Sequence, residues 1–165
     1  ASSEGYEWKP PAQVKRVLLV ADDTALPAVA GILEGLAQWP QPPEVQAFLE
    51  VEHEADVLPL RAPPGAQLFW LAREGAAHGQ RLQDAVRARI GPSGPCHGEQ
   101  ELAEIDIDQD ILWEQASAAG GGLYAWVAGE AGAVMAIRRH LVKSCGIDRE
   151  AITSMGYWRQ GRVLP

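Results

Sequence analysis

The sequence predicts an α/β protein: a doubly wound, mainly parallel five-stranded sheet with helices on both faces, of flavodoxin-like or Rossmann-like type. Short apolar runs of strand length alternate along the chain with segments whose apolar residues recur at helical spacing. The strand-like runs are nearly continuous in apolar residues, as expected for parallel strands that are buried on both faces. In such a sheet, ligands bind at the carboxyl ends of the strands, where the strand order reverses. We therefore expect a ligand crevice at that edge.

Five segments have the length and composition of strands. They are residues 17–21, 45–52, 66–72, 123–128 and 151–158, the last with the character of an edge strand. The first helix is expected to begin at Thr24 as its N-cap, to carry Pro27 in its first turn and to end at the prolines of residues 40–43. Further helices are expected around residues 82–90, over residues 108–119, and from about residue 131 to Gly146.

Composition limits the possible functions of the chain. Its 165 residues fit a single domain, here residues 16–165, preceded by a linker or expression tail at residues 1–15. A formal net charge of −8 disfavours nucleic acid and anionic membranes as partners, and no apolar run approaches the roughly 20 residues that span a bilayer. Cys96 and Cys145 are expected to be reduced thiols of a cytoplasmic protein. The cluster of Cys96, His97 and Glu99 has no second group of ligands to complete a site, so we expect no metal.

The charges are unevenly distributed. Seven acidic residues lie between Glu99 and Glu114 without a Lys or Arg among them, whereas basic residues predominate from Arg138 onward. The acidic run is most simply a solvated face. The basic end predicts a surface that meets an anion, and its candidate residues are Arg138, Arg139, Arg159 and Arg162.

The turn after the first strand reads ADDTALPA and contains no glycine, unlike the GxGxxG turn of common dinucleotide-binding proteins. A helix beginning at Thr24 would still offer N–H groups to a phosphate. Asp22 and Asp23 would repel a pyrophosphate unless they turn away or bind ribose hydroxyls. A simple capped helix without a ligand explains these residues equally well.

Two further features fall at expected strand ends. Gly129 and Glu130 follow the strand of residues 123–128, where a glycine would let a flat ring approach the backbone. Glu130 also suits the first turn of a helix for purely structural reasons. Arg73 follows the strand of residues 66–72, where a cation could meet an adenosine phosphate, although a plain surface arginine is commoner. No Ser/His/Asp array, nucleophile elbow or paired-carboxylate motif supports hydrolase chemistry.

Three longer motifs resemble one known family. VADDTALPA, LYAWVAGEAGAVMAIRRHL and GIDREAITSMGYWRQGR are similar to the siderophore-interacting protein family, the FAD-dependent NAD(P)H:ferric-siderophore reductases. The resemblance is to the C-terminal NAD(P)H-binding domain, which is like that of ferredoxin–NADP reductases, and it covers nearly the whole chain. The FAD-binding barrel that precedes this domain in the family has no counterpart in these residues.

The resemblance implies a set of site residues. The turn Asp23, Thr24, Ala25, Leu26 and Pro27 would flank the pyrophosphate of NAD(P)H, Gly129 and Glu130 would lie near the nicotinamide, and Arg73 would meet the adenosine ribose or its 2′-phosphate. The four arginines named above would face an anionic ferric siderophore.

The resemblance also implies partners. FAD is expected on an N-terminal domain that is missing from these residues and acts in cis or in trans, so the isolated chain is expected not to reduce iron. A domain-only module that binds a siderophore or a partner reductase without redox activity is the alternative. A flavodoxin-like FMN carrier is a third, weaker possibility.

Overall fold

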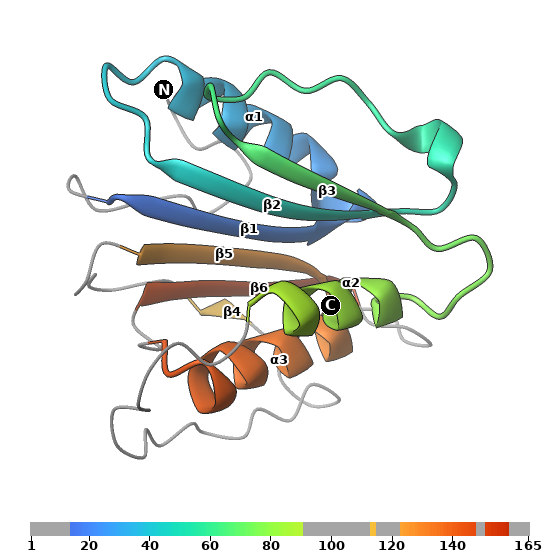
Figure 1. The fold of residues 1–165 in the computed structure, drawn as a ribbon. Coiled ribbons are helices and arrows are strands. Elements are labelled where there is room, and N and C mark those ends of the chain that lie inside the picture. Colours follow the sequence, from blue (N-terminus) through green and yellow to red (C-terminus); the bar gives the residue numbers. More distant parts are fainter. Residues whose placement is uncertain (1–13, 91–112, 115–122, 148–150, 159–165) are drawn as a thin grey trace.

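The computed structural model describes residues 14–90, 113–114, 123–147 and 151–158, and everything below concerns these residues. The strands are β1 (Arg16–Asp22), β2 (Glu44–Val51), β3 (Gln67–Ala72), β4 (Trp113–Glu114), β5 (Leu123–Glu130) and β6 (Ile152–Trp158). The helices are α1 (Leu26–Ala37), α2 (Gln80–Arg89) and α3 (Ala131–Arg139). Figure 1 shows the helices packed against a single twisted sheet.

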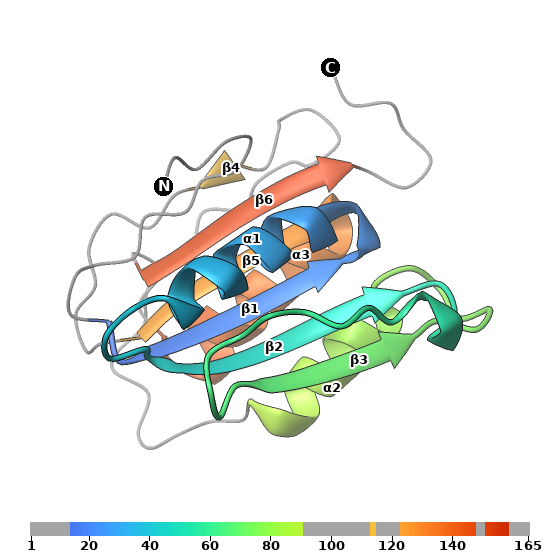
Figure 2. The ribbon, with the colours of Figure 1, turned by 90° about the horizontal axis from the view of Figure 1, so that it is seen from above.

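The sheet confirms the predicted fold class. Its strand order is β3-β2-β1-β5-β6-β4, and every pairing is parallel except that of the two-residue β4 with β6. Seen from above, α1 lies over the sheet while α2 and α3 lie beneath it (Figure 2). From β1 the chain winds to β2 and β3 on one side, and from β5 it winds to β6 on the other. The strand order therefore reverses between β1 and β5, whose carboxyl ends lie side by side.

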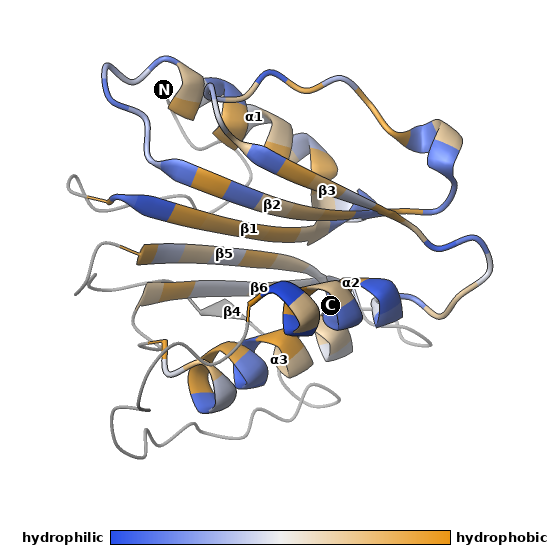
Figure 3. Ribbon diagram, in the orientation of Figure 1, coloured by the Kyte–Doolittle hydropathy of each residue, from blue (hydrophilic) through white to orange (hydrophobic). Residues whose placement is uncertain are grey.

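Alternating side chains of the strands build two cores. Leu19 and Trp126 face α1, whereas the neighbouring Leu18 and Val127 face α2 and α3. Both kinds of position are buried, which explains why the strands read as continuous apolar runs. Figure 3 shows this concentration of hydrophobic residues in β1, with hydrophilic residues where β1 and β2 begin.

No helix connects β2 to β3 within the described residues. A 3₁₀ turn, Glu54–Asp56, is followed by chain without regular secondary structure to Gly65. Leu60, Ala62 and Ala66 of this connection pack against the core on the α1 side. The connection thus covers the part of the sheet that α1 leaves open.

Three sequence predictions need correction. Residues 113–114 of the expected helix 108–119 form β4, because they pair with Met155 and Ser154 of β6; the rest of that segment lies outside the described residues. The same pairing corrects the expectation that residues 151–158 form an edge strand, because β6 has β5 on one side and β4 on the other at its centre. Thr24 is not the N-cap of α1, because Asp22 caps a 3₁₀ turn, Asp23–Ala25, and α1 begins only at Leu26.

In the described part of the chain, none of the helices is long and apolar enough to cross a membrane.

Candidate functional site

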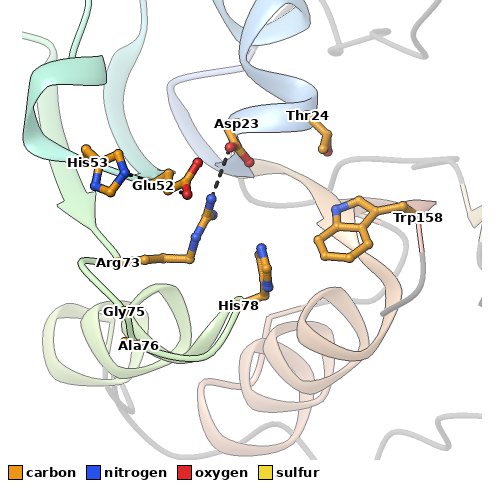
Figure 4. A pocket seen from close by; sticks show the side chains of 9 residues that line it. All are labelled: Asp23, Thr24, Glu52, His53, Arg73, Gly75, Ala76, His78 and Trp158. Carbon is orange, nitrogen blue, oxygen red and sulfur yellow. Dashed lines mark hydrogen bonds and ion pairs between the residues drawn. The ribbon is translucent and has the colours of Figure 1, made fainter. Parts of the chain in front are cut away.

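A cleft of about 610 Å³ opens at the carboxyl edge of the sheet. Its walls come from the turn after β1, the residues after β2, the loop between β3 and α2, and the end of β6 (Figure 4). The lining residues are Asp23, Thr24, Glu52, His53, Arg73, Gly75, Ala76, His78 and Trp158. Parallel strands place all these segments at one edge, so the cleft lies where the fold predicts a ligand.

Asp22, the last residue of β1, connects the segments beside this cleft through its hydrogen bonds. Its Oδ1 accepts hydrogen bonds from the Thr24 N–H at 3.0 Å and from the Thr24 hydroxyl. Its Oδ2 accepts from the Glu130 N–H at 3.0 Å and from Nε1 of Trp158 at 2.9 Å. The side chain is therefore turned inward and ties β1 to the ends of β5 and β6. Asp22 is only 4% exposed, so its charge does not face a ligand in the cleft.

Gly129 makes this arrangement sterically possible. Its φ is +151°, and a Cβ atom built there would lie 2.7 Å from Oδ2 and 2.8 Å from Cγ of Asp22. No side chain fits at that distance, and the conformation also favours glycine. The group that approaches the Gly129 backbone in the structure is thus the Asp22 carboxylate.

Glu130 has the structural role that its position suggested. It ends β5 and is the N-cap of α3, where its Oε1 accepts the Ala133 N–H at 2.9 Å. Glu130 is 6% exposed and does not belong to the cleft lining. Gly129 and Glu130 therefore form the corner next to the cleft and support its wall through Asp22.

Arg73 is buried within a charged cluster. Its Nη1 donates to Glu50 Oε1 at 3.0 Å and its Nη2 donates to Asp23 Oδ2 at 3.1 Å, and its side chain is 6% exposed. Burial acts to lower the pKa of Arg73, but the hydrogen bonds and charges of Asp23 and Glu50 outweigh it and raise the pKa above its ordinary value. The guanidinium is thus a fixed cation that is already paired with two carboxylates.

Glu50 connects this cluster to the loop between β3 and α2. Besides Arg73, its Oε1 accepts the Gly79 N–H at 2.9 Å and its Oε2 accepts the Leu82 N–H at 3.3 Å. Glu50 is 1% exposed, so these donors replace the water that its charge has lost. The carboxylate fixes the first turn of α2 and, with it, the position of His78 at the cleft.

Two aromatic rings form one wall of the cleft. The rings of His78 and Trp158 meet edge to face, with centroids 4.9 Å apart and an interplanar angle of 85°. A register shift between Gly129 and Glu130 places Trp158 opposite Glu130, and its indole then reaches Asp22. On the opposite wall, His53 lies between Glu52 and Glu74, with ring nitrogens 3.6 Å and 3.4 Å from their carboxylates.

The structure brings together only some of the predicted site residues. Asp23, Thr24 and Arg73 line the cleft, Ala25 and Leu26 are buried behind it, and Pro27 is exposed at the start of α1. The predicted arginine surface is wrong for Arg138, because this side chain lies on the inward face of α3 and is 2% exposed. Arg139 is exposed. Arg159 and Arg162 lie outside the described residues, as do Cys96, His97 and Glu99.

Sequence reasoning missed the cleft residues that follow β2, those between β3 and α2 other than Arg73, and the indole of β6. These are Glu52, His53, Gly75, Ala76, His78 and Trp158. A usable signal was present, since the carboxyl-end rule applies to every parallel strand and not only to those with a glycine or an arginine at the end. Applied to each predicted strand in turn, it would have selected Glu52, His53 and Trp158.

The fold and the cleft define a class before any relative is considered: a doubly wound α/β domain with an aromatic and acidic cleft at its switch-point edge. The family model described as siderophore-interacting protein matches residues 14–161. The chain therefore belongs to the siderophore-interacting protein family.

Two curated proteins show similarity to most of this chain. An uncharacterized protein of Mycobacterium tuberculosis is 32% identical over 151 residues, which cover 88% of this chain and 45% of that protein. The mycobactin import ATP-binding/permease protein IrtA of Mycolicibacterium smegmatis is 27% identical over 148 residues, which cover 89% of this chain and 13% of that protein.

Solved structures of the family share the fold. A siderophore utilization protein from T. fusca is 31% identical with a TM-score of 0.63, and the match covers 94% of this chain and 48% of that one. The siderophore-interacting protein SipS from Aeromonas hydrophila, at 24% identity and a TM-score of 0.63, shows the similarity of fold alone. The chain thus spans about half the length of these solved structures.

Proposed function

We propose that this chain is the NAD(P)H-binding domain of a flavin-dependent ferric-siderophore reductase. It would present the nicotinamide to FAD held on another domain, in cis or in trans. The observation that carries the proposal is the cleft at the carboxyl ends of β1, β2 and β3, beside the switch point between β1 and β5. Membership of the siderophore-interacting protein family supplies the iron-related context.

The cleft contains the types of side chain that can bind a dinucleotide. The rings of His78 and Trp158 offer faces and edges to a flat heterocycle. Carboxylates of Asp23 and Glu52 can accept hydrogen bonds from ribose hydroxyls. The hydroxyl of Thr24, which donates to Asp22, still has acceptor capacity toward the cleft.

The proposed roles of the nicotinamide, the flavin and the iron follow from the number of electrons that each one transfers. A nicotinamide releases a hydride, whereas Fe(III) accepts one electron, and a flavin supplies the conversion between the two. Siderophores offer hard oxygen ligands that suit Fe(III), so reduction loosens the metal. The residues of this chain would bind and orient the nucleotide: Trp158 as a wall held by Asp22, and the loop carrying His78 as a wall held by Glu50.

The ferric siderophore is proposed as the substrate of the whole reductase. The alternative is a module without redox activity that binds a siderophore or a partner reductase, and a basic surface of four arginines was its candidate binding surface. Because Arg138 is buried, that surface loses one of its members within the described residues. We therefore favour the reductase domain.

The proposal is tested by calorimetric titration of the chain with NADH and with NADPH. We expect at least one of them to bind with a dissociation constant of about 1 μM to 1 mM, the range of most enzyme–substrate pairs. His78→Ala should weaken binding, because it removes an exposed ring of the cleft without emptying the core.

The matched control is His140→Ala. His140 follows α3, at the end of that helix away from the cleft, where its Nε2 lies 2.7 Å from the Ile90 carbonyl oxygen. This variant should bind as the unaltered chain does. Absence of heat with both nucleotides would overturn the proposal, as would equal weakening by the two histidine variants.

A further inference from the structure

We propose that the cleft selects NADH over NADPH, that is, the dinucleotide without a 2′-phosphate. This inference rests on the proposed function and deepens it. In Rossmann domains that bind NAD, an acidic side chain after the second strand hydrogen-bonds the 2′-hydroxyl of the adenosine ribose. Glu52 occupies that position, because β2 ends at Val51 and the Glu52 side chain lines the cleft with 66% of its surface exposed.

The charges around Glu52 oppose a phosphate. Asp23 is the second carboxylate of the lining, and its side chain is 41% exposed. A phosphate monoester carries a charge of about −1.5 to −2 at neutral pH, so both carboxylates would repel it. A ribose hydroxyl, in contrast, is a neutral donor that either carboxylate can accept.

The cations near this position are already engaged. Arg73 is the single Lys or Arg among the described residues of the lining, and its two terminal nitrogens donate to Glu50 and Asp23. Turning Arg73 toward a phosphate would leave the buried charge of Glu50 with only backbone N–H donors, which is costly. His53 lies between Glu52 and Glu74, so a proton on its ring would be balanced by those two carboxylates.

Arg81 is a competing cation outside the lining. Its Nε donates to the Arg73 carbonyl oxygen at 3.1 Å, which directs that part of the guanidinium at the backbone of the loop. Recruitment of Arg81 or of another cation to a phosphate would reverse the selectivity, and the experiment below detects that result directly.

The test compares NADH and NADPH in calorimetric titrations of the chain at low ionic strength. NADH should bind at least about tenfold more tightly, because the 2′-phosphate would meet the exposed carboxylate of Glu52 and no unpaired arginine of the lining. The ratio should fall at about 1 M salt, where the Debye length is about 3 Å. Glu52→Gln should lower the ratio of NADH to NADPH affinity by about fivefold, the effect of one exposed charge at close range.

The matched control is Glu44→Gln, since Glu44 is an exposed glutamate at the opposite end of the same strand. It should leave the ratio unchanged. NADPH binding as tightly as NADH, or more tightly, would overturn the selectivity while leaving the proposed function intact. An equal effect of the two glutamate variants would overturn the role of Glu52. Binding of neither nucleotide would overturn the proposed function and this inference together.

Discussion

Asp22 and Gly129 form the contact on which the carboxyl edge of the sheet depends. The carboxylate accepts hydrogen bonds from three residues of three different segments, and it lies against a backbone that has no Cβ atom. The two residues are far apart in sequence, and the pairing of β1 with β5 brings them together. Asp22 thereby sets the position of Trp158, a wall of the cleft.

Gly129→Ala tests this contact. The added methyl group would lie within 3 Å of the Asp22 carboxylate at a positive φ, so we expect a loss of about 1–3 kcal/mol in the free energy of unfolding. Denaturant titration measures the change. Gly35→Ala is the matched control, because its Cβ meets no atom within 4 Å and the residue lies in α1. That variant should gain about 0.5–1 kcal/mol. Equal stability of the two variants would contradict the proposed contact.

At the scale of elements, one charged cluster joins β1, β2, β3 and α2. Glu50 comes from β2, Arg73 follows β3, Asp23 follows β1, and the N–H donors of Gly79 and Leu82 come from the start of α2. Gly79 also approaches α3 closely, since a Cβ atom there would overlap the Cβ of Ala133. The cluster therefore holds together several of the elements that bound the cleft.

Removing one partner at a time should show how unequal the two ion pairs are. Arg73→Met leaves the fully buried Glu50 carboxylate without its counter-charge, so we expect a loss of about 3–5 kcal/mol in the free energy of unfolding. Asp23→Asn affects a pair whose acid is 41% exposed and should cost about 1 kcal/mol or less. Thermal or denaturant unfolding measures both. Similar losses for the two variants would show that Glu50 is not the partner that matters.

The turn after β3 should respond to acid. The N–H of Glu54 and the ring of His53 hydrogen-bond to Glu74, and these interactions lower the pKa of Glu74 below its ordinary value of 4.5. A lowered folded-state pKa stabilises the fold at pH values above 4.5 and loses that contribution as the pH falls through the folded value. Stability measured from pH 6 downward should thus decline less steeply below 4.5 in Glu74→Gln. Glu34→Gln, an exposed change on α1, serves as the comparison. Identical slopes in the unaltered chain and Glu74→Gln would contradict the assignment.

Local sequence patterns predicted well those elements whose structure depends mainly on their own residues. The strand expected at residues 17–21 is Arg16–Asp22, and the proline that was placed in the first turn of α1 lies there. Prediction failed where distant residues compete. Asp22 caps the turn before α1 instead of Thr24, and residues 113–114 became a strand because β6 offered them a partner. The contacts of Asp22 with Trp158 and of Glu50 with Arg73 join segments that only the sheet order brings together.

At the scale of the whole molecule, the described residues form hollows at both edges of the sheet. The cleft at the carboxyl edge carries the acidic and aromatic residues described above. The second hollow, of about 740 Å³, lies at the amino edge and is lined by residues that include Arg16, Glu44 and Gln67. A dinucleotide should bind in the first, because it lies at the carboxyl ends of the parallel strands and is lined by the rings of His78 and Trp158.

Mapping of backbone amide shifts by NMR during titration with NADH tests this central claim most directly. The account predicts that the largest changes fall on residues around the carboxyl-edge cleft, including Thr24, Glu52, Gly75 and His78. Amides of Arg16, Glu44 and Gln67 at the amino edge should remain unchanged. Changes concentrated at the amino edge, or no changes at saturating NADH, would contradict it.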